Sequence, residues 1–337
     1  MGRLILANRR IPKGEWVLVT GANGYIASHI VDVLLCEGYK IRGTLRSHEE
    51  APWLEPYFTD KYGVGNFEIA IVTDLTDATG FERAAANMSG IIHSASILPS
   101  TSDVEAVVPS VTAGTRNALN AAAKHPSVKS FVLTSSSSAA YMSVFVKKDV
   151  IVDEPYSKNT PPSDLPLKIY AASKTLGERA LWEWTEQEKP TFTVNAVLPS
   201  FNIGKPLTAE VTTGSVHPVR AIVRGADPWF EVIRPHSFVN VRDNAYLHVA
   251  ALLDPTIRSQ RIFASAGKYN WNDIISIFRK LRPDNRLIPD PPQNEPRDLT
   301  NVDAVSKRAE TLLKSSFDVA GWTGLGQSLA ESLEDFE

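Results

Sequence analysis

A tyrosine and a lysine lie four residues apart in the stretch YAASK, at Tyr170 and Lys174. On a helix this spacing puts both side chains on one face, within reach of a common ligand. A free phenol titrates near pH ~10, too high for efficient proton transfer at neutral pH. A neighbouring ammonium and a cationic nicotinamide lower such a pKa, so the pair suits proton transfer coupled to hydride transfer. The alternative is an amphipathic helix with a packed tyrosine and a solvated lysine, and for an isolated pair that alternative is the commoner one.

Four serines, residues 135–138, follow the apolar run FVLT. Ligands of parallel sheets bind at the carboxyl ends of strands, where a hydroxyl can stabilise the oxyanion formed during hydride attack. The run can equally be a polar turn, and the residues alone do not single out one serine. Together with the tyrosine–lysine pair, however, a serine at this place predicts hydride-transfer chemistry.

The segment TGANGYIAS, residues 20–28, joins a predicted strand to a predicted helix. Gly21 and Gly24 permit a tight turn and close backbone approach, so that the helix N-terminus points at a pyrophosphate. Ala27, where many such turns have a third glycine, still allows close packing of the helix on the strand. An ordinary strand–helix turn also uses glycines, but the order strand, turn, helix, strand favours a nucleotide site.

The type of cofactor is indicated after the second predicted strand, in the stretch RGTLRSH. NAD-selective enzymes usually place an acid about 20 residues after the glycines, and none occurs here before Glu49. Arg46, with Ser47 as a second donor, suits the 2′-phosphate of NADP through charge-assisted hydrogen bonds, and the alternative is a solvated surface arginine. Asp74, at the end of the third strand, could accept the adenine amine or belong to a surface turn. NADPH/NADP+ is therefore the predicted cofactor.

Short β-rich runs alternate with helical stretches in the first half of the chain. We expect strands at 16–20, 39–45, 67–72, 90–93 and 130–134, and helices at 25–37, 80–87 and 104–124. The strands are apolar on both faces, which is typical of a parallel sheet covered by helices on both sides. The predicted fold class is therefore α/β, a Rossmann-type doubly wound parallel sheet with a smaller C-terminal substrate lobe.

The regular alternation of strands and helices ends after residue 138. Only 6 of the 22 prolines precede residue 151, so the later part of the chain is expected to be less regular. Residues 139–166 are expected to form a loop over the active site, followed by a helix at 167–188 and a strand at 192–198. Later elements are expected to be short, apart from amphipathic helices near 271–281 and 327–336. We therefore divide the chain into an NADP-binding Rossmann domain, 1–200, and a mainly substrate-binding lobe, 201–337, that partly returns to the first domain.

The composition excludes several classes of protein. The formal net charge of −3 argues against a nucleic-acid partner. No apolar run approaches the ~18 residues that span a bilayer, and the N-terminus lacks the features of a signal peptide, so we expect a cytoplasmic protein without a membrane partner. The single cysteine, Cys36, cannot form an internal disulfide and is expected to be a small buried side chain. The seven histidines show no metal-ligand spacing, and no metal is expected.

The chain resembles an extended short-chain dehydrogenase/reductase, specifically the fungal aldehyde/carbonyl reductase branch related to dihydroflavonol reductases. The motifs that carry the resemblance are TGANGYIAS, YKIRGTLRS, FVLTSSSS, YAASKTLGE and FTVNAVLPSFNIG, in the order of the family. They span residues 17–204, and WNDIISIFRKL with a GW-containing tail extends the likeness almost to the end. The set is far more specific than any single motif.

The resemblance implies roles for individual residues. Catalysis would fall to Ser136, Tyr170 and Lys174, with Ser135 structural. The implied cofactor contacts are Gly21, Asn23, Gly24, Tyr25 and Ile26 at the glycine-rich turn, Arg46 at the 2′-phosphate, Asp74 and Leu75 at the adenine, Ser94, Ala95 and Ser96 after the fourth strand, Tyr170 and Lys174 at the ribose, and Pro199 at the nicotinamide. His93-Ser94-Ala95-Ser96 replaces the Asn-Ala-Gly of shorter relatives. The asparagine of their proton relay is therefore not placed, and Asn117 is a candidate only by neighbourhood.

The implied function is reduction of aldehydes or ketones to chiral alcohols by NADPH, with Tyr170 as the proton donor. Hydroxysteroid dehydrogenases and sugar-nucleotide epimerases use the same scaffold, and some relatives are non-catalytic NADP-binding redox sensors. The substrate is expected to be a small, apolar or aromatic carbonyl compound, and the protein a monomer or homodimer. Aromatic residues that could wall the pocket, though each is singly more often core, are Phe145, Phe201, Trp229, Phe230 and Phe238.

Overall fold

Seven parallel strands form the central sheet of the computed structural model, which describes residues 2–97, 104–141, 165–211, 213–226 and 233–336. Their order is β3-β2-β1-β4-β5-β6-β9, so the winding reverses between β1 and β4. Ligands of doubly wound sheets bind at such a reversal, beyond the carboxyl ends of the strands. The strands are β1 (Trp16–Thr20), β2 (Lys40–Leu45), β3 (Phe67–Ile71), β4 (Gly90–His93), β5 (Ser130–Thr134), β6 (Thr193–Pro199) and β9 (Arg261–Ala264).

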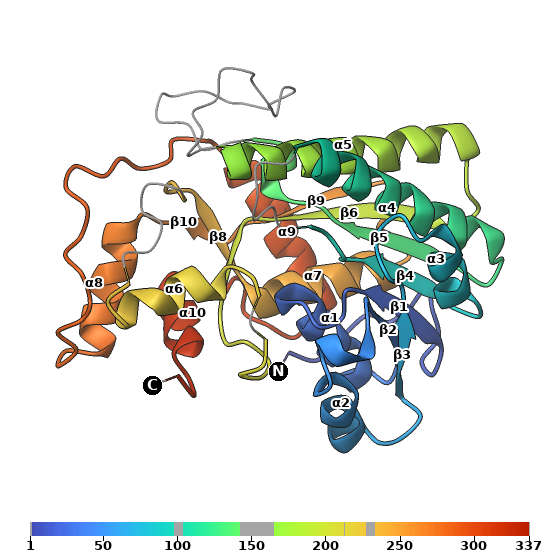
Figure 1. The fold of residues 1–337 in the computed structure, drawn as a ribbon, viewed down its shortest axis with the longest axis horizontal. Helices are drawn as coiled ribbons and strands as arrows, with labels where there is room; N and C mark the ends of the chain where they lie inside the picture. Colours follow the sequence, from blue (N-terminus) through green and yellow to red (C-terminus); the bar gives the residue numbers. More distant parts are fainter. Residues whose placement is uncertain (1, 98–103, 142–164, 212, 227–232, 337) are drawn as a thin grey trace.

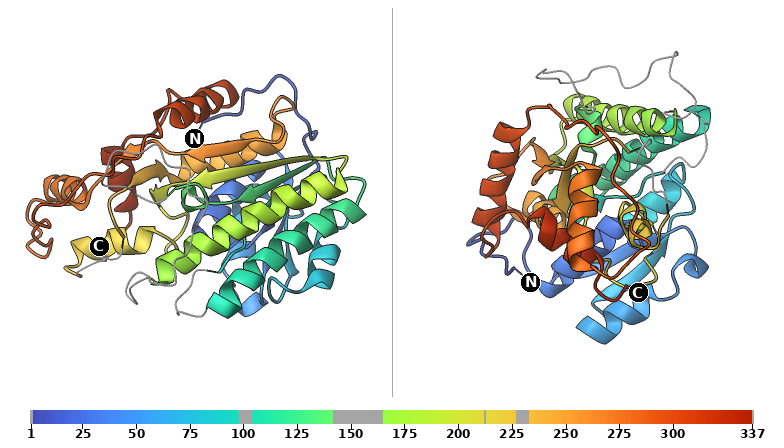
Figure 2. Two further views of the ribbon diagram at one scale, coloured as in Figure 1. Left: turned by 90° about the horizontal axis from the view of Figure 1, so that it is seen from above. Right: turned by 90° about the vertical axis from the view of Figure 1, so that its left-hand side faces the viewer.

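Helices cover both faces of this sheet (Figures 1 and 2). One layer contains α1 (Tyr25–Cys36), α7 (Val241–Leu253) and α9 (Asp303–Ser316). The other contains α3 (Ala78–Ala85), α4 (Val104–Lys124) and α5 (Leu165–Glu188). A short 3-10 turn, η1 (His48–Glu50), and helix α2 (Leu54–Tyr62) connect β2 to the edge strand β3. The predicted doubly wound α/β fold is confirmed.

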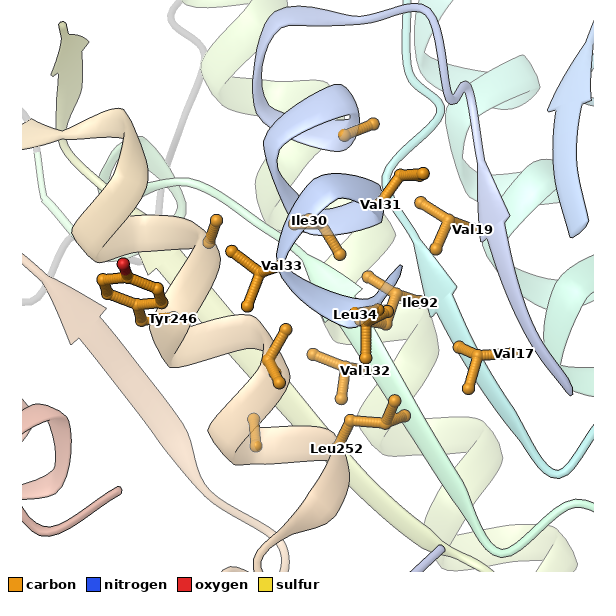
Figure 3. Packing of buried hydrophobic residues seen from close by; sticks show 14 of the residues in the cluster. Val17, Val19, Ile30, Val31, Val33, Leu34, Ile92, Val132, Tyr246 and Leu252 are labelled. Carbon is orange, nitrogen blue, oxygen red and sulfur yellow. The ribbon is translucent and has the colours of Figure 1, made fainter. Parts of the chain in front are cut away.

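Alternating side chains of each strand enter two separate cores. Val17 and Val19 of β1 pack with α1 and α7, whereas Leu18 points to the α3–α4–α5 side. Figure 3 shows the first core, where Ile30 and Leu34 of α1 and Leu252 of α7 meet above the strands. Because the side chains of a strand alternate between its faces, a strand covered on both sides must be apolar throughout.

A smaller three-stranded sheet lies beyond β6, in the order β10-β8-β7. Its strands are β7 (Phe201–Ile203), β8 (Ser237–Asn240) and β10 (Gly267–Lys268), with β8 antiparallel to β10 and parallel to β7. The helices α6 (Val216–Val223), α8 (Trp271–Leu281) and α10 (Leu325–Ser332) surround a third core there. Figure 1 shows this part on the left, beyond the carboxyl ends of the central strands.

The expectation of short elements after Pro199 is wrong for two helices. Helices α7 and α9 are 13 and 14 residues long, and β9 completes the central sheet beside β6. Every residue of α7 except Arg242 is buried, so the helix lacks the polar face that a periodicity search needs. The chain therefore returns to the large sheet after residue 240.

Cys36, the last residue of α1, is exposed and not buried as expected, although Val33, Leu34 and Leu35 before it are buried. Among the described residues no helix is both long and apolar enough to cross a membrane. Leu4 forms an isolated antiparallel bridge with Phe317, which ties the N-terminal segment to the end of α9.

Candidate active site

The glycine-rich turn between β1 and α1 is closed by backbone contacts that exclude a side chain. Gly21 has φ +67°, and a Cβ atom there would lie 3.0 Å from Cα of Ala95. Its N–H donates to Oγ1 of Thr44 (3.1 Å), and the N–H of Ala22 donates to the carbonyl of the same threonine (3.1 Å). The turn is therefore anchored to both neighbouring strands, and only glycine fits at position 21 without strain.

Helix α1 begins at this turn with an N-terminus that its own side chains leave open. Gly24 is the N-cap, makes no side-chain cap bond, and no acidic residue occupies the first turn. The phenol of Tyr25 donates to the carbonyl of Gly204 (2.8 Å) and is buried, so this side chain faces the protein interior. Tyr25 and Ile26 thus offer their backbone N–H groups, the groups that bind anions at helix N-termini.

The ends of β1 and β4 are joined by a buried hydroxyl. Oγ1 of Thr20 accepts from the N–H groups of Ser94 and Ala95, both at 3.0 Å, and lies 2.9 Å from Nδ1 of His93. Burial lowers the pKa of His93 to about 3, so its ring is neutral. The Ser94–Ala95–Ser96 segment is thereby held beside the glycine-rich turn. Oγ of Ser96 is buried without a hydrogen-bond partner and marks a polar position that a ligand can satisfy.

Arg46 follows β2 and is 74% exposed in its side chain. Its Nε donates to Oε1 of Glu50 (2.8 Å), and Nη2 contacts the same carboxylate oxygen. The guanidinium expected to face a 2′-phosphate therefore has an acidic partner within the chain. Sequence reasoning missed Glu50, although its spacing of four residues from Arg46 was a visible signal.

The residues expected near the adenine lie at the end of β3. Asp74 is exposed, and its Oδ1 accepts from the N–H of Thr76 (2.6 Å). The amide of Asn117 donates to the carbonyl of Leu75 (3.0 Å), so Asn117 supports this end of the site. Its amide is thus engaged at Leu75, which gives no support to a role beside Lys174.

Tyr170 and Ser136 come together from separate elements, α5 and the residues after β5. Oγ of Ser136 accepts from the N–H and the hydroxyl of Ser138, at 3.2 and 2.9 Å. Burial raises the pKa of Tyr170, while a hydrogen bond with Ser136 acts in the opposite direction. The lowering expected from Lys174 acting together with a cationic nicotinamide requires the cofactor, and in the protein alone burial of the phenol dominates. Tyr170 thus keeps its proton at neutral pH.

Lys174 lies one turn further along α5 and is buried. Its Nζ donates to the carbonyl of Thr134 (3.1 Å) and lies 5.8 Å from the centroid of the Tyr170 ring. Burial lowers the pKa of Lys174 to about 8, and the carboxylate of Glu178 partly opposes this effect. The ammonium is therefore fixed between the end of β5 and the tyrosine.

A buried carboxylate supports this arrangement from behind. Glu178 accepts from the hydroxyl of Ser135 (2.6 Å), from Nε of Arg261 (2.6 Å) and from the indole of Trp182 (3.1 Å). Glu178 therefore links β5, α5 and β9. It accepts a hydrogen bond from the hydroxyl of Ser135, the serine for which the family resemblance implies a structural role. Its spacing of four and eight residues from the lysine and tyrosine could have revealed it on the same helix face.

Pro199 ends β6, the strand that pairs with β5, and Phe201 begins β7. Phe201 packs edge-on against His236, with ring centroids 5.6 Å apart. Phe238 is 4% exposed inside the third core, so it belongs to the core of the smaller lobe. Phe145, Trp229, Phe230 and most of the 139–166 loop lie outside the described residues.

The sequence profile of the NAD dependent epimerase/dehydratase family matches residues 17–260, which include both the glycine-rich turn and the tyrosine–lysine helix. The chain belongs to this family, that of the extended short-chain dehydrogenases/reductases. Among its relatives are Ketoreductase adrE of Penicillium rubens, 39% identical over 96% of both chains, and Aldehyde reductase 2 of Sporidiobolus salmonicolor, 36% identical over 97% of this chain and 96% of that protein.

Solved structures of this fold include Gre2 in complex with NADPH from Candida albicans, with a TM-score of 0.80 and 23% identity over 95% of this chain and 98% of that one. Yeast methylglyoxal/isovaleraldehyde reductase Gre2 complexed with NADPH gives a TM-score of 0.77 and 24% identity, over 95% and 97%. At these identities the likeness establishes the shared extended short-chain dehydrogenase/reductase fold.

Proposed function

We propose that the chain is an NADPH-dependent carbonyl reductase that converts aldehydes or ketones to chiral alcohols. The contact of Ser136 with Tyr170, with Lys174 fixed beside the phenol, is the observation that carries this proposal. These side chains meet beyond the carboxyl end of β5, where parallel sheets bind their ligands. The names of the fungal relatives, ketoreductase and aldehyde reductase, support the same reaction class.

The residues present fit a dinucleotide. Gly21 leaves room for close backbone approach, the N-terminus of α1 is open to a pyrophosphate, and Ser96 has a buried hydroxyl in need of a partner. When bound, NADPH supplies the hydride that adds to the carbonyl carbon. We assign Arg46 to its 2′-phosphate, Asp74 and Leu75 to the adenine side, and Pro199 to the nicotinamide side.

Tyr170 is assigned as the proton donor. Its raised pKa keeps the phenol protonated, which is the form that reduction requires. Ser136 donates a hydrogen bond to the carbonyl oxygen and stabilises the charge that develops there. Lys174 holds the end of β5 through Thr134 and places its positive charge beside the phenol, where it favours proton release.

The domain division and the substrate class are part of the same proposal. Residues 1–200 are assigned to NADP binding, and residues 201–337 mainly to the substrate, with α7, β9 and α9 returning to the large sheet. Phe201 begins the smaller lobe next to Pro199, which favours an apolar or aromatic carbonyl compound. The protein is proposed to act in the cytoplasm as a monomer or homodimer.

The test is loss of NADPH absorbance at 340 nm with a panel of aldehydes and β-keto esters, followed by chiral analysis of the alcohol. We expect turnover with some members of the panel and an alcohol product of defined handedness. Tight NADPH binding without turnover across the panel would instead favour a redox sensor. Product formation from sugar nucleotides alone would favour an epimerase, and oxidation of hydroxysteroids alone would favour that dehydrogenase class.

A further inference from the structure

The ion pair between Arg46 and Glu50 places a negative charge at the proposed 2′-phosphate site. One carboxylate oxygen contacts both Nε and Nη2 of the guanidinium, and the other accepts from the backbone N–H of Arg46 at 3.2 Å. The Glu50 side chain is 22% exposed, against 74% for Arg46. The carboxylate is therefore more deeply buried than the guanidinium it binds.

The edge of the Arg46 guanidinium that Glu50 contacts is also an edge through which arginine binds phosphate. An arginine recognises a phosphate or a carboxylate through two adjacent N–H groups in a fixed fork. Since Glu50 occupies Nε and Nη2, a 2′-phosphate must displace it or use the remaining donors. An exposed ion pair is weak, so displacement is feasible, but it subtracts from the affinity for the phosphate.

A second contact ties this carboxylate to the glycine-rich turn. The pKa of Glu50 is lowered first by its hydrogen bond with Arg46 and also by one with the side chain of Asn23. Asn23 lies between Gly21 and Gly24, so Glu50 bridges the end of β2 and the turn that faces the pyrophosphate. The carboxylate stays charged at neutral pH and lies between the two segments that hold the adenosine half of the cofactor.

We propose that Glu50 is a specificity-determining residue that reduces the preference for NADPH over NADH by competing with the 2′-phosphate for Arg46. This inference rests on the proposed role of Arg46 in the NADPH-dependent reductase. A ribose 2′-hydroxyl is uncharged and leaves the Arg46–Glu50 pair intact, so NADH avoids the competition. The chain therefore accepts both cofactors more evenly than Arg46 alone predicts.

The experiment measures binding of 2′,5′-ADP and of ADP to the full chain by calorimetry, which needs no turnover. Glu50→Gln is expected to tighten 2′,5′-ADP binding by about fivefold and to leave ADP binding within about twofold. Glu55→Gln is the matched control, because it removes the same charge from an exposed residue in the first turn of α2. This control is expected to change neither affinity by more than about twofold.

A double-mutant cycle tests whether the effect passes through Arg46. In the Arg46→Ala background, Glu50→Gln should give less than half of its gain for 2′,5′-ADP. An equal gain in both backgrounds, an equal gain in Glu55→Gln, or unchanged or weaker binding in Glu50→Gln would each overturn the inference. If the wild-type chain does not prefer 2′,5′-ADP and Arg46→Ala has no effect, the assignment of Arg46 itself fails. Failure of the inference alone leaves that preference and its loss in Arg46→Ala in place.

Discussion

The hydroxyl of Ser135 donates a 2.6 Å hydrogen bond to Oε2 of Glu178, whereas the hydroxyl of the next residue, Ser136, contacts Tyr170. Successive side chains of an extended chain point to opposite sides, so two adjacent serines serve different partners. Ser135 binds a carboxylate that also receives Arg261 of β9. Ser136 is left for the phenol and, under the proposed mechanism, for the substrate carbonyl.

The two serines are therefore expected to respond differently to substitution by alanine. Ser136→Ala should lower kcat by about 100-fold, because an oxyanion donor is lost. It should lower the free energy of unfolding by only about 1 kcal/mol, because the lost hydroxyl also accepts from the N–H and hydroxyl of Ser138. Ser135→Ala should lower the free energy of unfolding by about 1–3 kcal/mol, because a buried hydrogen bond to a charged group is lost, and reduce kcat much less. Steady-state kinetics and urea unfolding of both variants test this, and equal loss of kcat would contradict the assignment.

Tyr170→Phe removes the proposed proton donor and leaves the ring. The expected result is a fall in kcat of about 10²–10⁴-fold, the usual contribution of a general acid, with a folded protein that still binds NADPH. Tyr62→Phe is the control, because it removes a phenol that lies outside the proposed site. The Tyr62 hydroxyl donates to Oδ1 of Asp32 at 2.7 Å. This variant should cost stability and leave kcat nearly unchanged. Near-normal turnover by Tyr170→Phe at neutral pH would disprove the role of the phenol.

Lys174 predicts a pH dependence of stability. Its pKa falls from 10.5 in the unfolded chain to about 8 in the folded one, so between these values the unfolded state binds more protons. The stability contributed by this residue therefore rises as the pH increases from about 8 to about 10.5. The unfolding free energy of wild type minus that of Lys174→Met should increase over this window, by at most about 3 kcal/mol. A flat or falling difference would show that folding does not lower the pKa of this lysine.

Arg46→Ala tests the choice of cofactor in turnover. Loss of charge-assisted hydrogen bonds to a phosphate should raise the KM for NADPH by about 10- to 100-fold, while the KM for NADH should change by less than about threefold. Because the side chain is largely exposed, folding should be unaffected. Equal changes for both cofactors would exclude a 2′-phosphate contact.

Gly21 and Gly14 both have a positive φ, +67° and +85°, so Gly14 serves as the control for Gly21. A Cβ at position 14 meets nothing within 4 Å, whereas one at position 21 meets the backbone of Ala95 at 3.0 Å. Gly14→Ala should therefore lower the free energy of unfolding by about 1 kcal/mol, the strain of a positive φ at a residue with a side chain, and leave NADPH binding intact. Gly21→Ala should lower the stability by more than this and should also weaken NADPH binding. Thermal unfolding measures the first effect and cofactor fluorescence the second. Similar behaviour of the two variants would disprove the close packing at this turn.

Much of the large sheet could be predicted because its strands and helices carry local signals. The strands Trp16–Thr20, Gly90–His93 and Ser130–Thr134 lie within the predicted bounds, since apolar runs between turn residues mark buried parallel strands. Helices Val104–Lys124 and Trp271–Leu281 also have their predicted bounds, because each has a polar face. Bringing Ser136, Tyr170 and Lys174 together follows from that same sheet and helix order.

The remaining features depend on contacts that sequence spacing does not reveal. Helix α7 is buried all round and so has no apolar periodicity, and β9 is a four-residue strand whose partner lies far away in the chain. The raised pKa of Tyr170 follows from burial, which the motif does not encode. Glu178 and Glu50 lie at helical spacing from known site residues, but only three-dimensional contacts show what they bind.

The late return of the chain to the central sheet has a consequence for synthesis on the ribosome. While residues up to 200 emerge, β6 remains an open edge, because its outer partner β9 is still untranslated. An unpaired edge strand invites pairing with other nascent chains. The antiparallel bridge of Leu4 forms later still, because its partner is Phe317. Both contacts are in place only after residue 317 has emerged, and until β9 has emerged the growing polypeptide exposes an edge that other nascent chains can pair with.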